Sequence, residues 1–302
     1  MSIEQLFRDL QEGKEVTHAS LTQLSGLGPE ESGLVSRFWA GVPVPRRLSL
    51  VDRLVELAED NVELDFSTVF KLWLRDPDER VRQRSITGLW ECEDRSLIPR
   101  LIELLQTDPS EEVRARAAMG LGQFAQLAAE GKLLERYQKR LEEALLQVLH
   151  HPQGPIEVWR RALEALAPLN TPEVQEMIRQ AYEGSRPELR SSALYAMGRS
   201  ADLQWFPLLV KELKSSDPAT RYEAAHACGE LGHEEAVGHL APLLQDDDYQ
   251  VQLAAIRACG RIGGRRARRL LRTQLPASDE GIEEAVEEAL RQMDVEEDIL
   301  RP

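Results

Sequence analysis

The amino-acid sequence predicts an all-α protein, an α-solenoid (superhelix) of about seven to eight two-helix repeats with a period of 31 residues. Three observations support this fold class. A chain of 302 residues exceeds the usual size of one compact core. Aromatic residues make up only 5% of the chain, and the apolar residues are largely Leu, Ala and Val, which suits packed helices. A pattern of small and apolar residues also recurs at a constant interval.

Each repeat is predicted to begin with a helix whose inner face is small. The pattern is counted from one anchor residue in each repeat. The anchors are Val81, Val113, Val158, Leu189, Thr220, Val251 and Ile282, and the last four intervals between them are each 31 residues. Seven residues after every anchor stands Ala or Gly, and the next residue is apolar. Offsets of four, seven and eight lie on one face of a helix. We therefore expect the backbone of a neighbouring helix to approach this face closely.

A second helix is predicted in each repeat. Mostly apolar residues follow about 16 to 24 positions after each anchor; after Thr220 they are Ala236, His239, Leu240, Leu243 and Leu244. Neither helix could bury its apolar face alone, so the two are expected to pack as a pair. Asp76, Asp108 and Asp217, each followed by Pro, are predicted N-caps of first helices.

The chain is expected to have three parts. Residues 1–45 are predicted to form an N-terminal helical cap, residues 46–293 the repeat solenoid, and residues 294–302 an acidic C-terminal tail. The interval of 45 residues between Val113 and Val158 indicates an insertion near 127–138, for which a longer helix is preferred over a recognition loop.

Composition and charge exclude several classes of function. A net charge of −15 opposes general binding to nucleic acids and anionic membranes. Three cysteines without a CxxC spacing favour neither disulfides nor a zinc site. Because there is no signal-like N-terminus and no apolar run of membrane length, we expect a cytoplasmic protein.

Two segments carry a resemblance to a known family. Residues VRARAAMGLG at 113–122 and TRYEAAHACGELGHEEAVGHLAPLL at 220–244 resemble the HEAT-repeat family, in particular the phycobilisome-lyase-type HEAT-like repeat. The resemblance covers roughly residues 46–293. It implies a right-handed α-solenoid that binds other proteins on a concave surface lined by second helices.

Three members of the wider class carry out chemistry. Resemblance to deoxyhypusine hydroxylase would imply His-Glu pairs two and three residues after the anchors, which hold two irons, but no histidine stands at those positions, as Gln83-Arg84 and Tyr222-Glu223 illustrate. Bilin lyase subunits share the repeat, although no chromophore-site motif is recognisable in this chain. HEAT-like DNA glycosylases use basic concave surfaces, which the net charge of −15 argues against.

The histidines near the fifth repeat do not predict a metal site. His226, His233 and His239 lie near three glutamates in the sequence, but the two-helix template points His226 outward and places His239 at a largely apolar position. Ligands of a metal ion must converge on one point. No metal, cofactor or catalytic residue is therefore predicted.

Residues 260–272, GRIGGRRARRLLR, hold six arginines and no acidic residue. Two interpretations remain open. In the preferred one, the arginines pair with the acidic segment that follows them and form a polar C-terminal cap, which solenoids need for solubility. In the other, they form a patch that receives an acidic partner.

The sequence thus favours a non-enzymatic HEAT-repeat scaffold or adaptor that binds a protein partner through its solenoid surface. Neither nucleic acid nor membrane is an expected partner. The alternative is a bilin-lyase-like or hydroxylase-like HEAT-repeat enzyme subunit. Candidate partner-binding residues are Gln204, Lys211, Glu235, Arg265, Arg266, Arg269 and Arg272.

Overall fold

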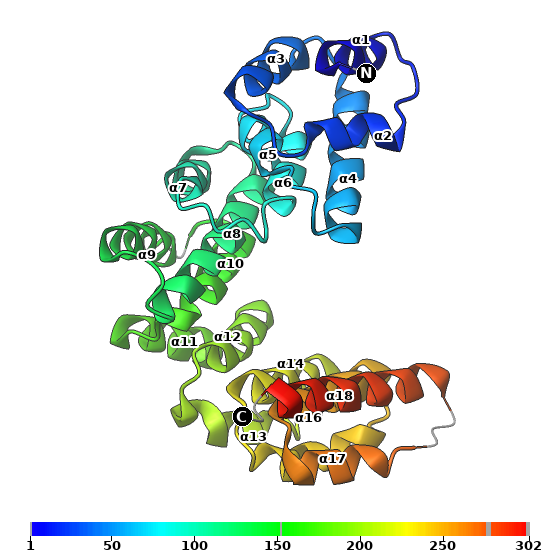
Figure 1. Ribbon diagram of the computed structural model, residues 1–302. Coiled ribbons are helices and arrows are strands. Elements are labelled where there is room, and N and C mark those ends of the chain that lie inside the picture. Colours follow the sequence, from blue (N-terminus) through cyan, green and yellow to red (C-terminus); the bar gives the residue numbers. More distant parts are fainter. Residues whose placement is uncertain (1, 152, 276–278, 300–302) are drawn as a thin grey trace. The chain divides into compact units, whose positions relative to one another are not determined.

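The computed structural model describes residues 2–151, 153–275 and 279–299, the last four of them by backbone alone. Throughout these residues the chain is helical, with no β-strand (Figure 1). The predicted α-solenoid of two-helix repeats is confirmed: within the described part, helices α4 to α17 form seven pairs, and α18 follows them. The chain divides into two compact units, Met1–Ala162 and Leu163–Pro302.

The first unit contains the predicted cap and the first repeats. Its helices are α1 (Ile3–Gln11), α2 (His18–Leu21), α3 (Pro29–Trp39), α4 (Val44–Asp60), α5 (Ser67–Trp73), α6 (Glu79–Thr87), α7 (Leu97–Thr107), α8 (Glu111–Ala129) and α9 (Glu135–Leu149). The unit boundary falls inside α10 (Ile156–Leu166). Repeats contact mainly their neighbours, so no change of composition marks this boundary in the sequence.

Aromatic rings join the N-terminal helices to the first repeat. The Trp39 ring of α3 stacks on the Trp73 ring of α5, with 4.2 Å between centroids, and Phe7 of α1 meets Trp39 edge-on at 6.3 Å. The indole N–H of Trp39 donates to Asp76 at 2.6 Å, and Arg47 pairs with the same carboxylate at 3.0 Å. Helix α3 therefore packs on the α4–α5 pair, and α1 packs on α3.

The second unit contains the later repeats. Its remaining helices are α11 (Pro172–Glu183), α12 (Pro187–Arg199), α13 (Phe206–Glu212), α14 (Pro218–Leu231), α15 (Ala236–Leu240), α16 (Tyr249–Ile262), α17 (Gly264–Arg272) and α18 (Glu280–Ile299). Short 3₁₀ turns extend several of them, including Ala241–Gln245 after α15. Residues 294–299 of the expected tail continue α18, and residues 300–302 lie outside the described residues.

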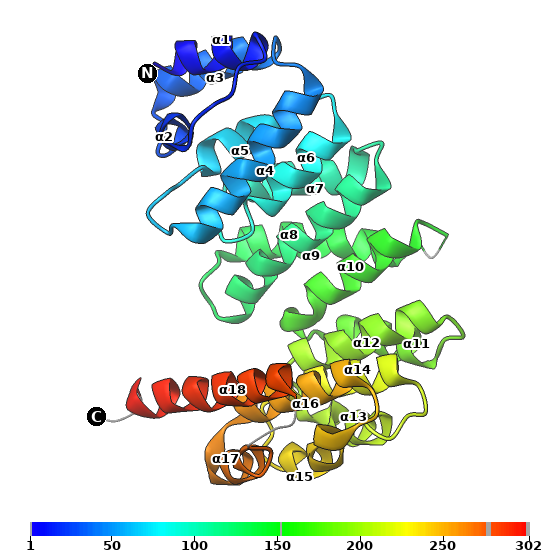
Figure 2. The ribbon, with the colours of Figure 1, turned by 90° about the vertical axis from the view of Figure 1, so that its right-hand side faces the viewer.

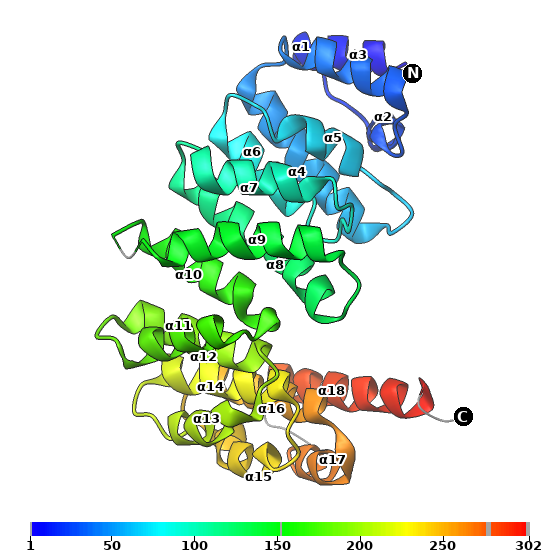
Figure 3. The ribbon, with the colours of Figure 1, turned by 90° about the vertical axis from the view of Figure 1, so that its left-hand side faces the viewer.

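First helices α12, α14, α16 and α18 lie side by side in the second unit, as Figures 2 and 3 show. Their predicted small face is buried: Ala224, Ala227 and Cys228 have no exposed surface. A side chain added at Gly229 would place its Cβ 2.8 Å from the Cα of Ala258. The equivalent distance is 2.6 Å from Gly198 to the Cα of Ala227, and 2.8 Å from Gly260 to the Cβ of Ala289. Glycine is thus required where neighbouring backbones touch.

Buried ion pairs fix the loops between repeats. Arg82, one residue after its anchor, binds both carboxylate oxygens of Asp108 at 2.8 Å. Arg221 holds Asp246 in the same way, at 2.8 and 2.7 Å. Each guanidinium also donates to backbone carbonyls at the start of its own helix, for example Arg82 to Asp76. These side chains satisfy polar groups that the loops would otherwise bury unpaired.

These pairs correct part of the N-cap prediction. Asp217 does cap α14, accepting from the Thr220 backbone N–H. Asp76 and Asp108 do not cap, because their carboxylates are engaged by arginines. The caps of α6 and α8 are the residues two positions later, Asp78 and Ser110.

One further expectation agrees with the structure and another differs. Helix α8 has 19 residues, so the extra residues near 127–138 lengthen it and the Glu130–Leu134 connection that follows. Trp159 is only 8% exposed and donates to the Leu149 carbonyl at 3.0 Å. His239 is exposed instead of buried, because Val237 occupies the inner face of short helix α15.

Among the described residues, no helix combines the length and the apolar character needed to span a membrane.

The Gly229→Ala variant should lower the stability of the second unit. The new Cβ would overlap the α16 backbone, and overpacking of this kind costs about 1–3 kcal/mol. Gly33→Ala in α3 is the matched control: nothing lies within 4 Å of its added Cβ, so it should be neutral or stabilise by about 0.5–1 kcal/mol. Thermal unfolding followed by circular dichroism measures both. Equal midpoints for Gly229→Ala and the unchanged chain would contradict the close approach.

The Asp108→Ala variant should destabilise the first unit strongly. It leaves the Arg82 guanidinium buried without its carboxylate, a loss that costs about 3–5 kcal/mol. Removing a carboxylate from an exposed pair, as in Glu135→Ala beside Lys139, should change the unfolding curve little. Urea unfolding of both variants tests this, and similar curves would show that burial of the pair is unimportant.

Candidate functional site

Helix α17 places its arginines through a tight connection from α16. Gly263 and Gly264 have φ values of +70° and +81°, which other residues rarely adopt, so the chain turns within two residues. Ala267 and Leu271 form the buried face of α17, while Arg265, Arg269 and Arg272 are exposed. The arginine-rich segment is therefore an amphipathic helix with its charged side toward solvent.

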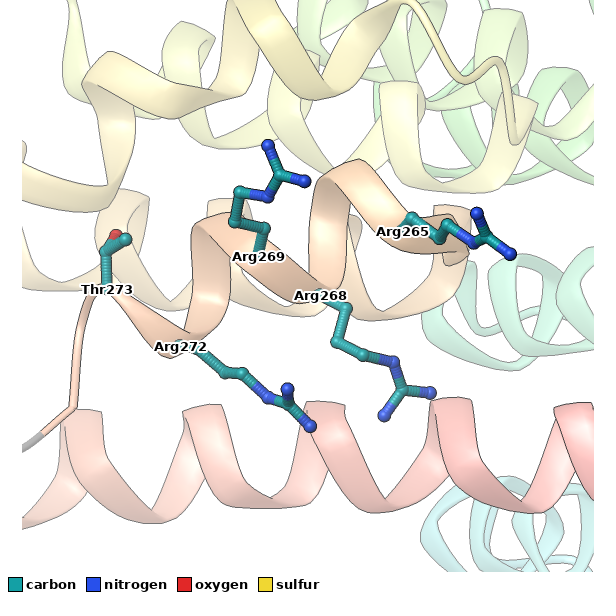
Figure 4. Close-up of a pocket in the computed structure, with 5 residues that line it drawn as sticks. All are labelled: Arg265, Arg268, Arg269, Arg272 and Thr273. Atoms are coloured by element: carbon teal, nitrogen blue, oxygen red, sulfur yellow. The ribbon is translucent and has the colours of Figure 1, made fainter.

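These side chains line an open hollow of about 480 Å³ (Figure 4). Its lining, called here the α17 arginine surface, consists of Arg265, Arg268, Arg269, Arg272 and Thr273. Arg268 and Arg272 point toward α18, whereas Arg265 and Arg269 point away from it (Figure 4). Guanidinium groups present several donors in a planar fork, which suits carboxylate or phosphate oxygens.

Only part of the arginine charge is neutralised within the described structure. Arg268 pairs with Asp294 of α18, and Arg261, at the end of α16, pairs with Glu230 of α14. Arg265, Arg269 and Arg272 make no ion pair with any carboxylate whose side chain the structure describes. The preferred prediction, in which the acidic segment answers most of this charge, therefore holds for Arg268 and not for the exposed arginines.

The stability of α17 favours arginine at positions 269 and 272 but not at position 265. Arg269 and Arg272 lie in the last turn of α17, where cations interact favourably with the helix dipole. Arg265 lies in the first turn, where the dipole disfavours a cation by about 0.3–1 kcal/mol. Because the first turn holds no acidic residue, the position of Arg265 is unfavourable for the helix itself.

The other candidate partner-binding residues lie outside this surface. Arg266 does not line the hollow; its guanidinium lies beside Gly238 of α15. Gln204 bonds to Asp202, Lys211 lies 3.8 Å from a Glu212 oxygen, and exposed Glu235 lies 3.7 Å from His233. Arg268 and Thr273 were absent from the candidate set. The three-residue spacing of Arg265 and Arg268 along one helix could have indicated Arg268.

A second polar cluster crosses helices α12, α14 and α16. The His226 ring stacks on the Tyr195 ring, with 5.8 Å between centroids, and its Nε2 lies 3.9 Å from Glu230. Burial lowers the pKa of His226, and Glu230 opposes that shift only in part. The imidazole is therefore neutral at neutral pH. His226 and Glu230 thus lie together, as their spacing of four residues on α14 places them.

The remaining histidines lie elsewhere. His233 and His239 flank Phe206, with ring centroids at 4.6 and 6.1 Å. No group of three or more His, Cys, Asp or Glu side chains in the described ranges is arranged to hold a metal ion. Burial raises the pKa values of the Cys228 and Cys259 thiols to about 12, so neither is a thiolate nucleophile at neutral pH.

No histidine stands at the positions that would hold iron in a hydroxylase, and several of these positions carry groups that are unsuitable as metal ligands. Two and three residues after the anchors, Arg84 pairs with Asp52 at 2.6 Å, and Ser192 donates to Glu164 at 2.6 Å. Arg160, at the equivalent position, pairs with Glu157 at 2.9 Å. Guanidinium groups are not metal ligands, and these side chains already have partners. The residues present do not fit a di-iron centre.

Comparisons with known proteins agree with this fold. The sequence model of HEAT repeats matches residues 67–141 and 206–291. Deoxyhypusine hydroxylase from Mus musculus is 32% identical over 98 residues, and that from Homo sapiens 31% over 97 residues. Each match covers 32% of this chain and 32% of the relative, so the chain aligns with about a third of the curated relatives' length.

A solved structure matches over nearly the whole chain. In the complex of CpcE and CpcF of phycocyanin lyase from Nostoc sp. PCC7120, one chain superimposes with a TM-score of 0.56 at 18% identity. The match covers 93% of this chain and 96% of that chain. At this identity it shows a shared fold.

These findings correct the expected function. The prediction of a non-enzymatic scaffold is wrong, because the curated relatives that the sequence matches are enzymes, and the alternative, an enzyme-like HEAT protein, is favoured. The architectural prediction is confirmed, since the HEAT-repeat matches together span more than half of the residues. The chain belongs to the HEAT-repeat family.

Proposed function

We propose that the chain is a subunit of a HEAT-repeat enzyme of the lyase type, acting on a protein substrate. The support for an enzyme is the similarity to deoxyhypusine hydroxylases, at 30–32% identity over about a third of their length. The support for the lyase type is the fold shared with a phycocyanin lyase chain over 93% of this sequence.

One observation carries the choice between the two enzyme types. No histidine stands at the repeat positions where a hydroxylase would hold iron, and three of these positions carry arginine or serine side chains already engaged with Asp52, Glu157 and Glu164. A lyase-type subunit requires no iron centre. Its part would be to bind and orient its substrates, for which the α17 arginine surface offers guanidinium groups to an anionic part of the substrate.

Iron loading tests whether the chain lacks the iron centre of a hydroxylase. After incubation with Fe²⁺ without oxygen and then desalting, the chain should retain far less than one iron per molecule, because no suitable ligand set converges in the described residues. Elemental analysis measures the stoichiometry, with deoxyhypusine hydroxylase as a positive control. Retention of two irons, with hydroxylation of a deoxyhypusine-containing protein, would establish the hydroxylase type instead.

Bilin transfer tests whether the chain has lyase-type activity. The chain is mixed with phycocyanobilin and with phycocyanin that lacks its chromophore. We expect a saturable change in the bilin absorption spectrum and covalent bilin on the acceptor protein, detected by fluorescence after denaturing electrophoresis. The urea-unfolded chain serves as the control for non-specific pigment binding. If neither the spectrum nor the acceptor changes, the lyase-type proposal is wrong.

A further inference from the structure

The α17 arginine surface is a local exception in an acidic protein. The chain has a net charge of −15, yet Arg265, Arg269 and Arg272 stand together without a carboxylate partner among the described side chains. We propose that this surface docks an acidic peptide segment of the enzyme's protein substrate. The substrate's role rests on the function proposed above, whereas the docking chemistry rests on α17 itself.

The protein already contains one example of this recognition. Asp294 of α18 presents its carboxylate to Arg268, and the Asp294 side chain is 64% exposed. A carboxylate supplied from a neighbouring segment therefore reaches the α17 arginines without being buried. The arginines that point away from α18 offer the same donors on the open side of the helix (Figure 4).

The length of the surface defines the size of the segment. Arg265 and Arg272 are seven residues apart, which spans about 10 Å along a helix axis. An extended peptide advances about 3.3 Å per residue, so about four residues cover this distance. Two or three carboxylates in such a segment could each meet one guanidinium in a bidentate arrangement.

The surroundings favour a short acidic peptide over a nucleic acid. The neighbouring helix α18 exposes Glu284, Glu287 and Glu288, and the chain as a whole has a net charge of −15. A duplex carries phosphates along its whole length, so the acidic protein would repel those that lie beyond the arginines. A short peptide can end where the arginines end.

The docking test uses fluorescein-labelled hexaglutamate and fluorescence anisotropy. Arg269→Glu reverses one charge at the surface and should weaken binding about tenfold, which corresponds to about 1.4 kcal/mol. Arg37→Glu is the matched control, because Arg37 is also an exposed arginine in the last turn of a helix, α3, and changes the net charge equally. It should change the affinity less than about twofold. Circular dichroism confirms that both variants are folded.

Other results of the anisotropy measurements would overturn the docking proposal or separate it from the proposed function. Equal weakening by both variants would show non-specific attraction and overturn the proposal, as would no binding by the unchanged chain. Tighter binding of a short labelled DNA duplex, lost in Arg269→Glu, would assign the surface to nucleic acid and also overturn it. If hexaglutamate binds as expected but no bilin is transferred, the docking site stands and only the lyase-type function fails.

Discussion

The second unit depends on the contact between glycine and alanine at neighbouring first helices. Gly198, Gly229 and Gly260 recur every 31 residues, and each faces the backbone of the next first helix with no space for a side chain. Contact at this distance buries main chain against main chain, which maximises dispersion contacts between small residues. Because the first helices are held this closely, each second helix has one place to pack.

This packing determines what the charged residues can do. Where a repeat loop is buried, an arginine one position after the anchor turns inward and binds an aspartate, as Arg82 binds Asp108. On α17, opposite the buried Ala267 and Leu271, arginines face solvent. The same residue type thus stabilises a buried loop in one place and forms an exposed charged surface in another. Exposure decides which role it takes.

The correction of function has a physical cause. A HEAT-repeat pattern reports which residues let helices stack, and those residues are Ala, Gly and Leu in scaffolds and enzymes alike. Chemistry depends on the few exposed positions that face a substrate, whose side chains the packing does not specify. The sequence interpretation argued against a di-iron site, because no His-Glu pair stands at the repeat positions. It did not argue against an enzyme that uses no iron.

The sequence by itself determined the repeat period and the small inner face of the first helices, because helical periodicity follows directly from residue spacing. Only the tertiary structure decided which charges meet. Arg268 reaches Asp294 while Arg265 and Arg269 do not, and Arg261 of α16 reaches Glu230 of α14. Long polar side chains can point in several directions from one backbone position, so their partners depend on neighbouring helices that the local sequence does not place.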